Sequence, residues 1–181
     1  MQCPIDSTAL VLVDVQERLV NALPDIQPRL PKVITALKAA AALNLDVIVT
    51  EQYPKGLGPT LADVRAACPA GAPVIEKTSF SCWGEENFRL ALKAKKRQTV
   101  VLMGIEAHVC VQQTAFDLLV EAYEVVLLAD AVASRNAEDC RIALELMRAK
   151  GVWVTTTESF LFSLLGSAKH PGFKAVSALV K

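Results

Sequence analysis

Residues 98–113 read QTVVLMGIEAHVCVQQ, a stretch that passes from a strand to a helix within a few residues. Gln98–Gly104 is an almost continuous apolar run, which is typical of a strand covered on both faces. A short turn follows Gly104, and the spacing then predicts a helix over His108–Ala122. A buried strand that leads directly into a helix is part of a βαβ unit.

The same alternation continues through the whole chain. Five further strands are predicted, at Ala9–Asp14, Asp46–Thr50, Pro73–Glu76, Glu124–Ala129 and Val152–Thr155. The other predicted helices are Leu30–Leu43, Glu85–Lys95, Ala137–Lys150, Thr157–Leu165 and a last one from Pro171 to about Leu179. This order predicts an α/β fold, a three-layer α-β-α sandwich with a six-stranded, mostly parallel, Rossmann-like sheet. Residues 1–181 are expected to form one domain.

The composition favours a soluble intracellular protein. Apolar residues make up 52% of the chain, and 19 basic residues balance 19 acidic ones. A nucleic-acid or anionic-membrane partner would require a basic excess, and no apolar run is long enough to span a bilayer. The N-terminus lacks the pattern of a signal peptide. We therefore expect a cytoplasmic protein with no nucleic-acid or membrane partner. Its zero net charge favours a homo-oligomer.

The cysteine and histidine content limits the possible sites. The five cysteines are odd in number, scattered, and include no CxxC pair, which favours free thiols over a disulfide framework. His108 and His170 are the two histidines, too few for a histidine-rich metal site. We expect no metal and no cofactor.

Three chemically capable side chains follow three different predicted strands. Asp14 ends the first strand, Lys77 follows the third, and Cys110 lies in the first turn of the helix after the fourth. The carboxyl ends of parallel strands meet at one edge, so these side chains are expected to converge. The helix dipole and Lys77 would lower the pKa of Cys110, and Asp14 could act as general base. Taken singly, each has a structural explanation: a helix cap, a solvated loop lysine and an inert buried cysteine.

Five residues are predicted to form the walls of a substrate pocket: Gln16, Gln52, Phe80, Trp83 and Ile105. The two glutamines follow the first two strands, although both could instead cap loops. The two aromatic residues could instead pack in the core. Glu106 either points a carboxylate into the pocket, where it would disfavour acidic substrates, or faces solvent.

Several motifs occur in a fixed order: LVLVDVQ at Leu10–Gln16, TEQYPKGLG at Thr50–Gly58, EKTSF at Glu76–Phe80, GIEAHVCV at Gly104–Val111 and ADAVA at Ala129–Ala133. In this set the chain resembles the isochorismatase-like cysteine hydrolases, a superfamily that includes nicotinamidases and N-carbamoylsarcosine amidohydrolase. The resemblance implies Cys110 as nucleophile, Asp14 as general acid/base and Lys77 as orienting cation. It also implies a cis peptide at Ile105–Glu106 and an oxyanion hole formed by the backbone N–H groups of Glu106 and Cys110. The implied reaction is attack on an amide-like carbonyl, loss of amine and hydrolysis of a thioester.

This sequence differs from two groups within the superfamily, and these differences limit the activities that are expected. Nicotinamidases carry an Asp-x-His metal motif where this chain has Glu51–Tyr53, and isochorismatases proper act without a cysteine nucleophile. The leading hypothesis is a metal-independent hydrolase of C–N bonds in small neutral amides. The alternatives are a non-catalytic binding or scaffold protein of the same fold, and a mononucleotide or flavin binder. The nucleotide or flavin binder is disfavoured, because no glycine-rich phosphate loop follows the first strand of this sequence.

Overall fold

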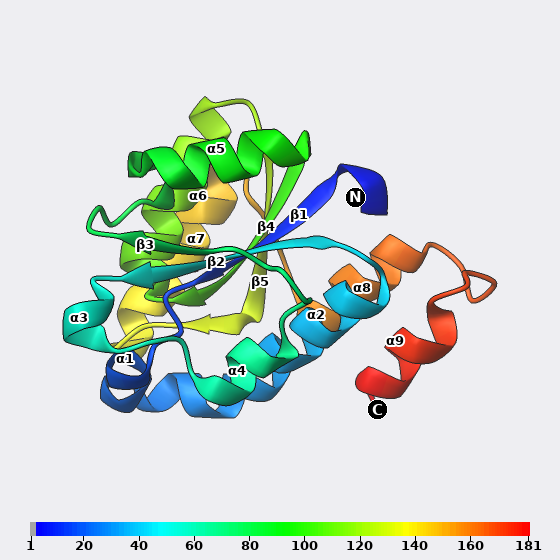
Figure 1. The fold of residues 1–181 in the computed structure, drawn as a ribbon, viewed down its shortest axis with the longest axis horizontal. Coiled ribbons are helices and arrows are strands. Elements are labelled where there is room, and N and C mark those ends of the chain that lie inside the picture. The colour runs from blue at the N-terminus through cyan, green and yellow to red at the C-terminus, as the bar shows by residue number, and fades with distance from the viewer. Residues whose placement is uncertain (1–2) are drawn as a thin grey trace.

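The computed structural model describes residues 3–181, which form a parallel six-stranded sheet between two layers of helices (Figure 1). The strands are β1 (Thr8–Val13), β2 (Asp46–Gln52), β3 (Val74–Lys77), β4 (Thr99–Ile105), β5 (Glu124–Ala133) and β6 (Trp153–Thr155). Their order is β3-β2-β1-β4-β5-β6, and every neighbouring pair is parallel. The predicted α/β, Rossmann-like fold is confirmed. The strand order reverses between β1 and β4, the place where open α/β sheets bind ligands.

Helices cover both faces of the sheet. They are α1 (Glu17–Ala22), α2 (Leu30–Ala42), α3 (Pro54–Leu57), α4 (Ala62–Ala67), α5 (Glu86–Lys95), α6 (Gln112–Val120), α7 (Ala137–Ala149), α8 (Thr157–Leu165) and α9 (Phe173–Leu179). The shorter turns are η1 (Ile5–Ser7), η2 (Pro24–Arg29), η3 (Cys82–Gly84) and a π-helical turn η4 (Ala107–Val111). Helices α5, α6 and α7 lie on one face, and α2, α4, α8 and α9 lie on the other (Figure 1). None of the helices within residues 3–181 is both long and apolar enough to cross a membrane.

Two apolar clusters, one on each face of the sheet, form the core. In β1, Leu10 and Leu12 join the cluster beneath α2 and α8, whereas Val11 and Val13 join the cluster beneath α5, α6 and α7. Every residue of β1 is buried, which explains why its sequence shows no apolar–polar alternation. Burial on both faces fixes the register, and therefore the residues that leave the carboxyl ends of the strands.

The prediction for β5 was wrong at its carboxyl end. The strand runs to Ala133, four residues past the predicted end at Ala129, and pairs there with the end of β4 after a register shift. Asp130 interrupts the apolar pattern inside the strand. Its Oδ1 accepts hydrogen bonds from the N–H and the hydroxyl of Thr157, both at 2.8 Å, at the start of α8. The carboxylate therefore anchors a helix and does not mark the end of the strand.

The helix that follows β4 also differs from the prediction. Its first turn, η4, is π-helical and contains Cys110, and the α-helical part begins only at Gln112. Turns of this kind occur often at functional sites. The short helices α1, α3 and α4 escape the sequence pattern because each has six residues or fewer, too few to show a helical period.

Candidate active site

The structure brings Asp14, Lys77 and Cys110 together at the carboxyl edge of the sheet. Asp14 follows β1, Lys77 ends β3, and Cys110 lies in η4 just after β4. Lys77 Nζ lies 2.7 Å from Asp14 Oδ2, and both side chains are completely buried. After burial, the charges of Asp14 and Lys77 have the largest effects on the pKa of the Cys110 thiol. Three segments that are distant in sequence thus supply one cluster of an acid, a cation and a thiol.

Asp14 is held by its neighbour strand. Its backbone φ is +53°, and its N–H donates to the carbonyl of Thr50 at 3.2 Å. The Thr50 hydroxyl donates to Asp14 Oδ1 at 2.7 Å. The other oxygen, Oδ2, lies 2.7 Å from the Lys77 ammonium and forms the ion pair with it. Oδ1 is therefore held by Thr50 and Oδ2 by Lys77, and Oδ2, like any carboxylate oxygen, has a second lone pair that can take a proton.

Lys77 is a fixed, buried cation. Its ammonium donates to Gln52 Oε1 at 2.6 Å and to the backbone carbonyls of Ser79 and Phe80 at 3.2 and 3.0 Å. Burial by itself would lower the pKa of Lys77, but the adjacent Asp14 carboxylate acts in the opposite direction, and the pKa lies above its ordinary value. The ammonium therefore remains charged, and its orientation is set by four acceptors.

The resting thiol of Cys110 is protonated, which corrects the sequence-based prediction of a lowered pKa. The side chain is buried, and this burial raises the pKa to about 12, with the adjacent Asp14 carboxylate acting in the same direction and Lys77 only partly opposing them. The prediction considered the helix end and the lysine but not the depth of the residue. A thiol of this kind becomes a nucleophile only when it gives up its proton, and Asp14 is the adjacent acceptor.

A cavity of about 330 Å³ opens onto Cys110. It is lined by Leu19, Gln52, Leu57, Phe80, Ile105, Glu106, Val109, Cys110 and Arg135. Gln52, Phe80 and Ile105 are among the predicted walls. Leu19 comes from α1 and Leu57 from α3, the short helices that the sequence pattern does not reveal. Of the three candidate catalytic residues, Cys110 alone lines this cavity.

Gln16 and Trp83 do not line the cavity, in contrast to the prediction. Gln16 is completely buried and bonds to backbone: its Oε1 accepts from Gln52 N–H at 2.7 Å, and its Nε2 donates to the carbonyls of Gln52 and Gly58 at 3.0 and 2.6 Å. Trp83 packs edge-on against Tyr123, and Lys93 lies over its ring. Gln16 thus bonds to loop backbone and Trp83 packs at the edge of the core, which are the structural alternatives that the sequence left open.

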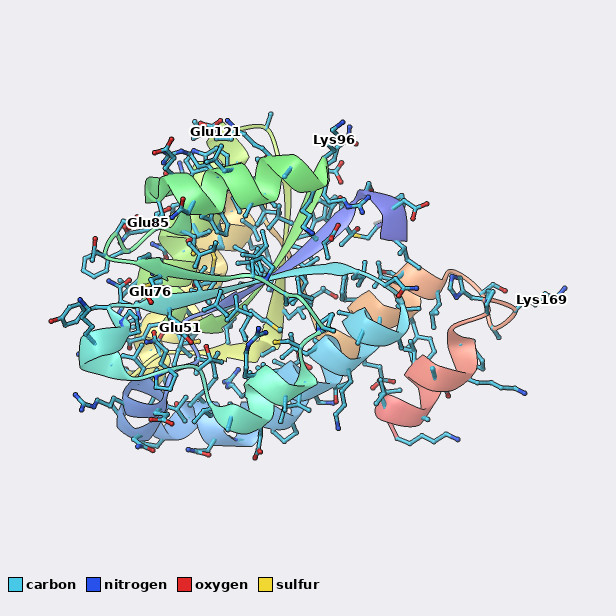
Figure 2. The ribbon with its side chains drawn as sticks, viewed as in Figure 1. Glu51, Glu76, Glu85, Lys96, Glu121 and Lys169 are labelled. Carbon is cyan, nitrogen blue, oxygen red and sulfur yellow. The ribbon has the colours of Figure 1, made fainter. Side chains whose placement is uncertain are left out.

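Two carboxylates anchor loops at the same edge of the molecule (Figure 2). Glu51 Oε1 accepts from the N–H and the hydroxyl of Thr60, both at 2.7 Å. Glu85 Oε1 accepts from Thr78 N–H at 3.0 Å and from Ser79 N–H and Oγ at 3.1 and 2.8 Å. The hydrogen bonds from Ser79 and Thr78 lower the pKa of Glu85. The loop that supplies carbonyls to the Lys77 ammonium is thereby fixed.

Thr114 joins the nucleophile turn to that loop. Its hydroxyl donates to the carbonyl of Cys110 at 2.6 Å and accepts from the N–H of Cys82 at 2.9 Å. Cys82 is fully buried, and burial raises its pKa to about 11.

All five cysteines are free thiols. Within residues 3–181, no three or more His, Cys, Asp or Glu side chains are grouped so that they could hold a metal ion.

Glu106 and Arg135 form an ion pair on the cavity wall. Glu106 Oε2 accepts from Arg135 N–H at 2.9 Å and from Arg135 Nε at 3.2 Å. The Ile105–Glu106 peptide is cis, as the resemblance implies. Arg135 escaped the sequence analysis because β5 was expected to end before it. The signal that could have revealed it is the small-residue stretch Ala129–Ala133, which continues the strand to the same edge.

Comparisons with known proteins agree with this fold. The sequence profile of the isochorismatase domain matches residues 8–159. Isochorismatase domain-containing protein 2 of Danio rerio is 40% identical over 174 residues, covering 96% of this chain and 86% of the relative. The structure of MAR1 ribonuclease from Caenorhabditis elegans superimposes with a TM-score of 0.92 at 37% identity, covering 99% of this chain and 92% of that one. The YcaC gene product of Escherichia coli, described as an octameric hydrolase of unknown specificity, shares the fold with a TM-score of 0.92 at 24% identity, covering 99% and 90%.

Proposed function

We propose that this chain, which belongs to the isochorismatase family, hydrolyses a C–N bond of a small, uncharged, amide-like substrate through a thioester on Cys110. One observation carries the proposal: a thiol that lines a cavity is adjacent to a buried carboxylate that is itself paired with a buried lysine. A nucleophile beside a base that is itself oriented is the arrangement that covalent catalysis requires.

In the first half of the reaction, Cys110 Sγ bonds to the substrate carbonyl carbon while its proton passes to Asp14 Oδ2. The backbone N–H groups of Glu106 and Cys110 are the donors we propose for the oxyanion that forms. The intermediate then collapses: the C–N bond breaks, and the leaving nitrogen takes the proton from Asp14. The products of this half are a free amine and an acyl-thioester.

In the second half, Asp14 takes a proton from water, and the resulting hydroxide attacks the thioester carbonyl. The C–S bond breaks, the carboxylic acid leaves, and Cys110 recovers its proton. Lys77 remains protonated throughout because its pKa is raised, and its charge offsets the negative charge that moves between Cys110 and Asp14. No step needs a group that the chain lacks.

The decisive experiment is capture of the intermediate. The protein is mixed with a panel of small amides and ureides, quenched in acid and digested, and the peptide that contains Cys110 is searched for the mass of an acyl group. We expect an adduct on Cys110 for any amide that is turned over, and a loss of about 10³-fold or more in kcat for Cys110→Ala. Cys140→Ala is the matched control. It removes a thiol of α7 that does not line the cavity, and the variant should keep full activity.

The same panel separates the alternatives. Absence of both turnover and adduct over amides and esters would reject the hydrolase and favour a binding or scaffold protein. RNA is included because MAR1 ribonuclease is among the similar structures. We expect no RNA cleavage, since the chain has no net charge and Arg135, the arginine that lines the cavity, is paired with Glu106.

The assembly and location that we propose are a homo-oligomer, a dimer or tetramer, in the cytoplasm. Sedimentation velocity measures the first, and the fluorescence of a tagged full-length chain in cells measures the second. A monomer at all accessible concentrations would reject the oligomer.

A further inference from the structure

The wall of the cavity carries charge at one place only. Among the side chains that line it, Glu106 and Arg135 are ionic, and all others except Gln52 and Cys110 are apolar. The amide of Gln52 is already committed: its Oε1 accepts from Lys77 at 2.6 Å, and its Nε2 donates to the carbonyl of Thr78 at 2.9 Å. Polar recognition of a substrate by side chains therefore depends on the Glu106–Arg135 pair.

The two members of this pair differ in how firmly they are placed. The Glu106 side chain is 11% exposed, and its Oε2 accepts both the backbone N–H and the Nε of Arg135. The Arg135 side chain is 67% exposed. Glu106 is thus a fixed carboxylate beside Cys110, and Arg135 is a cation that it holds at the rim. Oε1 of Glu106 accepts no hydrogen bond from residues 3–181 and can meet a donor from a ligand.

The charges around the nucleophile cancel in two pairs. Asp14 balances Lys77 across 2.7 Å, and Glu106 balances Arg135 across 3.2 Å. An entering carboxylate meets the fixed Glu106 carboxylate, and the Arg135 guanidinium, whose charge Glu106 offsets, supplies no unpaired countercharge. An entering ammonium meets the guanidinium beside that carboxylate, and the neutral pair supplies no unpaired countercharge for it either. In a partly enclosed, apolar cavity such like-charge contacts are weakly screened and therefore costly.

We infer that Glu106 sets the substrate class of this site: by neutralising Arg135 it restricts the cavity to uncharged amides and ureides with an apolar substituent, and it excludes carboxylates. This inference deepens the proposed function and rests on it. The N–H groups of an amide or ureide suit the free Oε1 of Glu106, and the apolar substituent suits Leu19, Leu57 and Val109. Replacing Glu106 by glutamine would leave Arg135 unpaired and turn the same cavity into one that accepts anions.

Two alkylating reagents of nearly equal size test this without turnover: iodoacetamide, which is neutral, and iodoacetate, which is anionic. In both reactions Cys110 Sγ bonds to the methylene carbon, the C–I bond breaks, iodide leaves and the thiol proton goes to solvent. The rate for the Cys110 peptide is measured by mass spectrometry at about pH 8.5, where a raised-pKa thiol still reacts slowly. The rate with iodoacetamide is divided by the rate with iodoacetate. This ratio is then divided by the same ratio for 2-mercaptoethanol, which corrects for the intrinsic reactivity of the two reagents.

For the native protein we expect a normalised ratio of about ten or more in favour of iodoacetamide. Glu106→Gln should bring the ratio to one or below, and Arg135→Gln should raise it above the native value. Glu138→Gln is the matched control, because it removes a carboxylate from an arginine pair on α7 that does not line the cavity. Its ratio should equal the native one. Circular dichroism of each variant verifies that the fold is kept.

Equal labelling by the two reagents in the native protein would overturn the inference, as would a native ratio that persists in Glu106→Gln. Failure of both reagents to label Cys110 up to about pH 10 would also overturn it, because the cavity would then admit neither. The proposed hydrolase is judged separately: a protein with the expected ratio but without an acyl adduct keeps the charge selection and loses the reaction.

Discussion

The ammonium nitrogen of Lys77 lies 2.7 Å from Asp14 Oδ2, and neither side chain reaches solvent. Removing two charges from water is costly, and their attraction repays the cost only when both partners are present. Thr50 and Gln52 complete the pair by bonding to Asp14 Oδ1 and to the Lys77 ammonium. The pair is thus stable only as a unit, and this makes it testable.

Lys77→Met is expected to destabilise the fold by about 3–5 kcal/mol, because it leaves the Asp14 carboxylate buried without a countercharge. The double variant Asp14→Asn with Lys77→Met should recover most of this loss, since no charge then remains buried. Urea denaturation followed by circular dichroism measures both.

Lys95→Met is the control for that experiment. Lys95 pairs with Asp46 at 2.8 Å, but its side chain is 35% exposed, so we expect a loss of at most about 1 kcal/mol. If Lys77→Met cost no more than Lys95→Met, the description of Asp14 and Lys77 as a mutually dependent buried pair would be refuted.

The reactivity of Cys110 should keep rising with pH. Because burial and the Asp14 carboxylate raise its pKa to about 12, the thiolate fraction increases about tenfold per pH unit from pH 7 to pH 10. The rate of iodoacetamide labelling at Cys110 should follow it without a plateau. A plateau by about pH 8.5 would show that the thiol is already ionised there and would contradict the raised pKa.

Asp14→Asn should move that profile to lower pH. The substitution removes the negative charge that raises the thiol pKa and leaves the Lys77 ammonium, which lowers it. Labelling at about pH 8 should therefore become faster although turnover of any amide is lost. A variant that simply unfolds would expose Cys68 and Cys140 to the reagent as well, and peptide mapping distinguishes this outcome.

The strands were predictable because burial on both faces leaves a continuous apolar run in the sequence. β1 and β4 are the clearest cases, and their ends place Asp14 and Cys110 at the point where the strand order reverses. Parallel strands that share one edge then bring Lys77 to the same place. The convergence of the three residues needed no knowledge beyond the alternation of strand and helix.

The rest of the site depends on tertiary contacts that no local pattern encodes. Arg135 reaches the cavity because β5 continues past Asp130, whose carboxylate bonds to Thr157 at the start of α8. The side-chain amide of Gln16 donates hydrogen bonds to backbone carbonyls that are distant in sequence and is not available to a ligand. The raised pKa of Cys110 comes from its depth and from Asp14, neither of which a helix position reveals.

Gly104 is required where β4 passes the end of β1. Its φ is +116°, and a Cβ at this position would overlap the carbonyl oxygen of Val13, the residue before Asp14. Gly104→Ala should therefore cost about 4 kcal/mol or more, or give insoluble protein. Gly151→Ala is the control, since Gly151 also has a positive φ, +98°, but nothing within 4 Å of the added atom. It should cost only about 1–3 kcal/mol of backbone strain. If thermal denaturation showed equal losses of stability for the two variants, the backbone of Val13 would be able to move away from the added Cβ at little cost.

Thr114 is the remaining link between the nucleophile and the lysine loop. Its hydroxyl donates to the Cys110 carbonyl and accepts from the Cys82 N–H, and the side chain is completely buried. Thr114→Val keeps the shape but leaves the Cys82 N–H without its partner, so we expect a loss of about 1–3 kcal/mol in the free energy of unfolding. The freed loop should also position the Lys77 ammonium less well, so kcat for a hydrolysed amide should fall more than KM changes.

Thr114→Ser decides whether these losses come from the hydroxyl. Serine keeps both hydrogen bonds and removes only a methyl group, so its kcat and its pH profile of Cys110 labelling should stay near the native values even where some stability is lost. If Thr114→Ser lowered kcat as much as Thr114→Val did, the packing of the methyl group would control the nucleophile turn, and the hydrogen-bonded link between Cys110 and Cys82 would have no part in catalysis.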